Sequence, residues 1–61
     1  MKQINVLVVD DDRDVLSTLS EILAELRLNP VTAGDGVEAL EKIRTRKIDL
    51  IITDLMMPNL D

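Results

Sequence analysis

Acidic side chains gather at two points of this chain where apolar runs end. Asp10, Asp11 and Asp12 follow the first run directly, and Asp54 follows the last one. Carboxylate oxygens without histidine or cysteine are ligands for hard divalent cations such as Mg²⁺, Ca²⁺ or Mn²⁺. A single Asp at such a place is usually a helix cap or a turn former, so only their joint placement predicts a metal site.

Composition excludes several other kinds of site. The 61 residues contain no histidine and no cysteine, which rules out a Ser-His-Asp or Cys-His triad and a thiolate or imidazole metal centre. Aromatic residues are absent and the formal charge is −5, so base stacking and phosphate-backbone binding are both disfavoured. We therefore expect no direct nucleic-acid binding by this segment. The apolar run at 6–9 is too short for a membrane span, and we expect a soluble, cytoplasmic protein with no membrane contact.

The elements that must position the acidic residues alternate between strand and helix. β-Branched apolar runs predict strands, and helical spacing of apolar residues predicts helices. The predicted strands cover about 4–9, 31–33 and 48–53, and the predicted helices about 14–27 and 36–46. The order β-α-β-α-β favours one α/β domain over 1–61 with a parallel sheet and crossover helices.

Capping residues and apolar stripes define the two predicted helices. Asp12 is a candidate N-cap of the first helix, and Asp35 with Glu38 resembles a capping box for the second. Asn29-Pro30 is expected to stop the first helix. The stripes expected to face the core are Val15, Leu19, Ile22 and Leu26, widened by Leu16 and Leu23, in the first helix and Val37, Leu40 and Ile43 in the second.

Right-handed crossovers leave two sheet orders, 1-2-3 and 2-1-3. The first and third strands look buried on both faces and the second is short and polar enough for an edge, which favours 2-1-3. In that order Asp10 and Asp11 lie at the carboxyl end of the strand beside the one that ends at Asp54. Ligands of parallel sheets bind at this edge, so the three carboxylates are expected to converge on one site.

Three segments together resemble the amino-terminal half of a response-regulator receiver domain of two-component signalling. They are VVDDD at 8–12, AGDGVEAL at 33–40 and DLIITDLMMPNLD at 49–61. Their order and spacing cover nearly the whole chain. The resemblance implies half of a flavodoxin-like, doubly wound parallel sheet.

The resemblance also implies roles for individual residues. Asp54 would be the phosphoacceptor, modified by a phosphohistidine of a sensor histidine kinase. Asp10, Asp11 and Asp54, with the backbone carbonyl of Met56, would hold Mg²⁺. A receiver of this kind is modified by its partner and is not itself counted as an enzyme.

The resemblance covers a truncated receiver, because the chain ends after the predicted third strand. The Ser or Thr and the Lys that the family places at the ends of its fourth and fifth strands have no counterpart before Asp61. We therefore expect the fragment alone to be inactive or weakly active. The third strand, with Leu50, Ile51 and Ile52, is expected to be an apolar edge that promotes a homo-oligomer.

Two other functions remain open at this point. The chain could be a self-assembling half-domain, a segment-swapped or edge-strand dimer without chemistry. It could also be a fragment of a metal-dependent hydrolase that uses the same acidic cluster, although no general acid or base is evident. If the chain is a receiver, Asp54→Asn should abolish a phosphoryl adduct. If it is a self-assembling half-domain, a charged residue at Ile51 or Ile52 should break the assembly.

Overall fold

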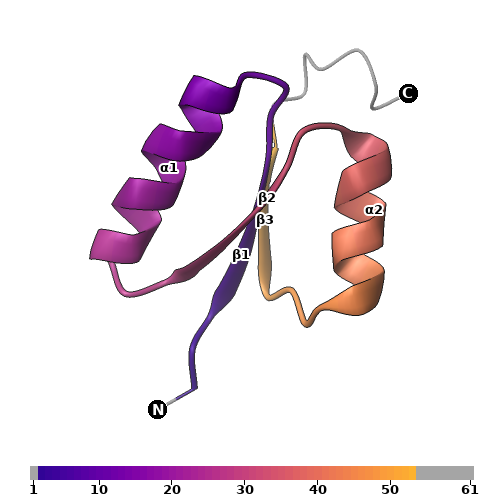
Figure 1. The fold of residues 1–61 in the computed structure, drawn as a ribbon. Helices are drawn as coiled ribbons and strands as arrows, with labels where there is room; N and C mark the ends of the chain where they lie inside the picture. The colour runs from indigo at the N-terminus through magenta and orange to yellow at the C-terminus, as the bar shows by residue number, and fades with distance from the viewer. Residues whose placement is uncertain (1, 54–61) are drawn as a thin grey trace.

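The computed structural model describes residues 2–53. The chain forms three strands and two helices in strict alternation (Figure 1). These are β1 (Asn5–Val9), α1 (Arg13–Glu25), β2 (Asn29–Ala33), α2 (Gly36–Thr45) and β3 (Leu50–Thr53). Within the described residues, neither helix is long and apolar enough to cross a bilayer.

The sheet is parallel and has the order β2-β1-β3, as the sequence predicts for a flavodoxin-like half. Val9 is in register with Ala33 on one side and with Thr53 on the other. The carboxyl ends of all three strands therefore lie at one edge of the sheet. The two helices cover opposite faces of the sheet (Figure 1).

Strand β1 supplies most of the core and is buried on both faces. Val6 and Val8 pack with Leu23 beneath α1, together with the partly buried Leu16, Leu19 and Leu28. Leu7 and Val9 pack on the other face with Val31, Ala33 and Ala39 of β2 and α2. The continuous apolar sequence of β1 is explained by this two-sided burial.

Strand β3 differs from the prediction that it is buried on both faces. Leu50, Ile51 and Ile52 are 56%, 53% and 42% exposed. The reason is that both helices contact β1 and β2, and neither contacts β3 within the described residues. β3 is instead the open edge that the sequence also suggested.

Helix α1 ends two residues before the predicted limit of 27. Arg27 has a left-handed φ of 64°, its N–H donates to Ala24 O at 3.0 Å, and the Leu28 N–H donates to Leu23 O at 2.9 Å. These two bonds form a Schellman turn, which stops the helix before Asn29-Pro30 is reached.

Pro30 therefore does not end α1 but lies inside β2. The Asn29 N–H donates to Ile4 O of the neighbouring segment, so by alternation the missing N–H of Pro30 faces the outer edge.

The predicted helix faces are partly wrong. In α1, Leu16, Leu19 and Leu23 face the sheet, whereas Ile22 and Leu26 are exposed. In α2 the whole predicted stripe of Val37, Leu40 and Ile43 is exposed, and the small Ala39 packs on the sheet. An alanine at the contact lets the helix backbone approach β2 closely. The larger residues then point away from β1 and β2.

A polar clasp joins the three strands at their amino ends. The Asn5 side chain donates through Nδ2 to Lys47 O at 2.6 Å and accepts at Oδ1 from Asn29 Nδ2 at 2.8 Å. The Asn5 N–H donates to Asp49 Oδ2 at 2.8 Å, and the Asp49 N–H donates to Asn5 O at 2.9 Å. These bonds connect β1 to both neighbours and fix the strand register.

Candidate functional site

The site begins where β1 ends. The Asp10 N–H donates to Ala33 O at 3.1 Å, which continues the β1–β2 ladder by one residue. The Asp10 carboxylate accepts the Asp12 N–H through Oδ1 at 2.9 Å, so its second oxygen is available. Asp11 is exposed and its carboxylate accepts no hydrogen bond from residues 2–53. The structure thus places both predicted metal ligands at the carboxyl edge of the sheet, with oxygens left to coordinate.

Asp12 has a different task from its two neighbours. Its side chain accepts the N–H groups of Asp14 at 2.9 Å and Val15 at 3.4 Å, which caps the first turn of α1. The predicted N-cap is therefore confirmed. An aspartate there also complements the positive end of the helix dipole. Asp12 is thereby occupied as a cap, which separates it from Asp10 and Asp11.

The remaining predicted site residues follow β3. Thr53 ends that strand in register with Val9, so β3 and β1 end at the same edge of the sheet. Asp54 and Met56 themselves lie outside the described residues. Within 2–53 no three acidic side chains lie close enough together to hold a metal ion.

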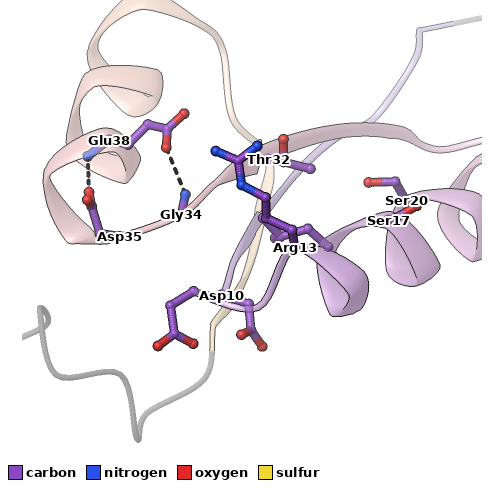
Figure 2. A pocket seen from close by; sticks show the side chains of 10 residues that line it. Asp10, Arg13, Ser17, Ser20, Thr32, Gly34, Asp35 and Glu38 are labelled. Carbon is purple, nitrogen blue, oxygen red and sulfur yellow. Dashed lines mark hydrogen bonds between the residues drawn. The ribbon is translucent and has the colours of Figure 1, made fainter.

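A capping box shapes the neighbouring loop between β2 and α2. Asp35 accepts the Glu38 N–H at 2.8 Å, and Glu38 Oε1 accepts the Gly34 N–H at 2.8 Å (Figure 2). The predicted capping box of Asp35 and Glu38 is confirmed. The Glu38 side chain accepts the N–H of Gly34, which is one residue before the N-cap Asp35. Both carboxylates are engaged in this local structure, so they are poorer candidates for metal binding than Asp11.

Figure 2 shows a polar cleft between α1 and the loop after β2, with Asp10 at its mouth. Its volume is about 620 Å³. Its described lining comes from the end of β1, from α1, from β2 and from the loop that leads into α2. Sequence reasoning missed its wall on α1, formed by Arg13, Ser17 and Ser20. The spacing of four and three residues places these polar groups on one face of a helix, and this was the signal available.

The donor set described here fits Mg²⁺. This ion usually takes one or two protein carboxylates and keeps several waters. Asp10 and Asp11 supply two carboxylates beside each other at an exposed strand end. Both leave room for further oxygen ligands.

Comparison with known proteins agrees with this geometry. The sequence model of the response regulator receiver domain matches residues 6–61. The chain is 45% identical over 56 residues to the alkaline phosphatase synthesis transcriptional regulatory protein PhoP of Bacillus subtilis, covering 92% of this chain and 23% of that protein. It is 45% identical over 58 residues to the response regulator MprA of Mycobacterium ulcerans, covering 95% of this chain and 25% of that protein.

A solved structure shows the same fold. The chemotaxis response regulator CheY4 of Vibrio cholerae superposes with a TM-score of 0.87 at 37% identity, over 93% of this chain and 48% of that one. The chain thus spans about a quarter of the length of these curated relatives and about half of the solved domain. The match over residues 6–61 shows that the chain belongs to the response regulator receiver domain family.

Proposed function

We propose that this chain carries the phosphoacceptor part of a receiver domain, with Asp54 as the modified residue. One observation supports this above the others. Strands β1 and β3 are adjacent and in register from Val6↔Leu50 to Val9↔Thr53, so the residues that directly precede Asp10 and Asp54 in the sequence lie side by side at one end of the sheet. This arrangement is the one on which ligand sites of doubly wound sheets are built.

The proposed chemistry is carboxylate nucleophilic attack. An oxygen of the Asp54 carboxylate attacks the phosphorus of a phosphohistidine, and the phosphorus–nitrogen bond breaks. The imidazole nitrogen keeps the electron pair and takes up a proton, and an acyl phosphate forms on Asp54. The chain is changed once by each transfer and does not turn over a substrate, so it acts as a signalling acceptor and not as an enzyme.

Asp10 and Asp11 have the supporting role in this proposal. Receiver domains are generally Mg²⁺-dependent, and these two carboxylates, with Asp54 and the Met56 carbonyl, would hold the ion. When bound, Mg²⁺ neutralises negative charge as the phosphoryl group approaches. Asp10 is oriented by its bond from the Asp12 N–H, whereas Asp11 is free to adjust.

The partner implied by this function is a histidine kinase of a two-component system. Receiver domains interact with such kinases, and we propose that this chain acts in the cytoplasm beside its phosphoryl donor. The formal charge of −5 is unfavourable for direct contact with nucleic acid by this segment.

Incubation with a small phosphoramidate donor, followed by intact-mass spectrometry, tests the proposal. We expect a low-yield adduct of one phosphoryl group that requires Mg²⁺ and disappears in Asp54→Asn. The exposed Asp14 provides a matched control, because Asp14→Asn removes a carboxylate from the same acidic region without touching the proposed ligands. An adduct that persists in Asp54→Asn would contradict the assignment.

A second candidate function is association of the chain with itself. The exposure of Leu50, Ile51 and Ile52 on an open sheet edge favours it. Such an edge pairs readily with another strand.

A further inference from the structure

Arg13 differs from the other basic residues of this chain in its position. It is the first residue of α1 and lines the cleft that also contains Asp10 and Asp11 (Figure 2). The other six of the seven Lys and Arg residues lie before β1, near the end of α2 or in the segments that lead into β2 and β3; they are Lys2, Arg27, Lys42, Arg44, Arg46 and Lys47. Within residues 2–53, Arg13 is therefore the one cation at the carboxyl edge of the sheet.

Helix formation does not explain an arginine at this position. A cation in the first turn of a helix faces the positive end of the helix dipole, which is unfavourable. Asp12 and Asp14, on either side of Arg13, carry the negative charge that this end of α1 prefers. Residues that break such a local rule are expected at functional sites, where a second requirement outweighs the first.

The acidic groups around Arg13 supply a second requirement. Asp10 and Asp11 follow β1 directly, and Asp35 and Glu38 line the same cleft from the loop into α2 and from its first turn. Carboxylates held this close repel one another, and a nearby cation offsets that repulsion. Figure 2 shows the Arg13 side chain extending away from the Asp10 carboxylate, so the charge of Arg13 acts across the cleft and not through contact with Asp10.

We propose that Arg13 is a built-in counter-charge of the metal site and lowers the affinity of that site for Mg²⁺. This inference rests on the proposed function, in which Asp10 and Asp11 hold the ion. Arg13 is attracted by the carboxylates in the metal-free chain and is repelled by the two positive charges of a bound Mg²⁺. The chain loses part of this attraction when the ion binds, so Mg²⁺ binds more weakly than it would without Arg13.

Coulomb's law gives the size of the effect. In a water-like dielectric, a unit charge about 6–10 Å from a divalent ion changes the binding constant about fourfold to tenfold. Arg13 follows Asp11 by two residues, which keeps their Cα atoms within about 8 Å of each other. Arginine keeps its charge throughout the physiological pH range, so the counter-charge is permanent.

Titration with MgCl₂ at about 0.01 M salt, followed by amide ¹⁵N–¹H NMR, measures this affinity. We expect Arg13→Gln and Arg13→Ala to lower the dissociation constant for Mg²⁺ about threefold to tenfold. Arg13→Lys keeps the charge and should stay within about twofold of the natural chain. Arg44→Gln is the matched control and should also change little, because Arg44 is an exposed helical arginine in the last turn of α2. Circular dichroism shows whether each variant is folded.

A change of salt concentration separates the charge of Arg13 from its packing. The Debye length falls from about 30 Å at 0.01 M salt to about 3 Å at 1 M. The difference between the natural chain and Arg13→Gln should therefore disappear at high salt. A difference that persists there, or that Arg13→Lys shares, would overturn the counter-charge.

The outcomes distinguish the inference from the function on which it rests. A lower dissociation constant in the two neutral variants, restored by lysine, supports the counter-charge. Saturable shifts at Asp10 and Asp11 whose dissociation constant is unchanged or higher in Arg13→Gln overturn the counter-charge alone. A natural chain without Mg²⁺-dependent shifts at Asp10 and Asp11 overturns both the metal site and the counter-charge.

Discussion

Asn5→Ala is expected to loosen all three strands at once. The Asn5 side chain makes two hydrogen bonds, from Nδ2 to Lys47 O at 2.6 Å and from Asn29 Nδ2 to Oδ1 at 2.8 Å. Alanine removes both, while the backbone bonds between Asn5 and Asp49 can persist. Asparagine and alanine are both poor strand formers, so intrinsic strand propensity contributes little to the difference.

The magnitude follows from the two lost bonds. A typical intramolecular hydrogen bond contributes about 0.5–1.5 kcal/mol net, and the half-buried position of Asn5 argues for the lower part of that range. We expect the free energy of unfolding to fall by about 1–2 kcal/mol. A single small core of this size supplies about 3–5 kcal/mol, so the loss is a large fraction of the total. The melting temperature should fall by about 5–10 °C.

Urea unfolding followed by circular dichroism measures this loss. Lys47→Ala is the matched control, because Asn5 bonds to the backbone carbonyl of Lys47 and not to its side chain. A double-mutant cycle of Asn5→Ala with Asn29→Ala should give a coupling of at least about 0.5 kcal/mol, because the two side chains are bonded directly. An effect of Asn5→Ala within about 0.3 kcal/mol of zero would refute the clasp as a stabilising element.

Three further changes test the fold at other points. Leu7→Ala, in the centre of the core, should cost about 2–5 kcal/mol and leave most of the chain unfolded by circular dichroism, whereas a cooperative melt near the native temperature would argue against that core. Asp12→Ala removes the acceptor of the Asp14 and Val15 N–H groups and should cost about 1 kcal/mol in urea unfolding, while Asp12→Asn should cost much less. Arg27→Gly relieves a left-handed φ of 64° and should raise the free energy of unfolding by up to about 1 kcal/mol, so a loss of stability would contradict the Schellman turn.

Much of the fold was predictable because its signals are local. The apolar β-branched run of β1 predicts a strand buried on both faces, and Val6 and Leu7 are indeed buried on opposite faces. Asp12 and Asp35 predict helix starts, since a cap depends on residues within one turn. The sequence also favoured the sheet order 2-1-3 over 1-2-3, because crossover handedness leaves few alternatives, and the structure confirms that order.

The incorrect predictions concern features that tertiary packing, and not the local sequence, determines. Arg27 takes a backbone conformation that usually requires glycine, so the end of α1 had no sequence signal. Pro30 is tolerated in β2 because that strand is at an edge. The spacing of apolar residues predicts an amphipathic helix but does not determine which of its apolar residues contact the sheet. In α2 the contact is made by Ala39, whereas Leu40 is exposed.

The candidate site was predictable in part. Asp10 and Asp11 lie at the predicted edge because both follow β1 directly. The polar wall of Arg13, Ser17 and Ser20 was missed, because helical spacing of polar residues usually indicates only a solvated face. The roles of Asp54 and Met56 rest on family resemblance and on the direction of β3, and they remain proposals.

Titration of the chain with Mg²⁺, followed by amide ¹⁵N–¹H NMR, is the most direct test of the proposed metal site. We expect saturable shifts confined to the amides of Asp10, Asp11, Asp54 and their neighbours. Asp11→Asn should weaken this response strongly, and Asp14→Asn should leave it unchanged. A spectrum indifferent to Mg²⁺, or a response centred on Asp35 and Glu38, would contradict the assignment of a receiver-type metal site to the carboxyl edge of β1 and β3.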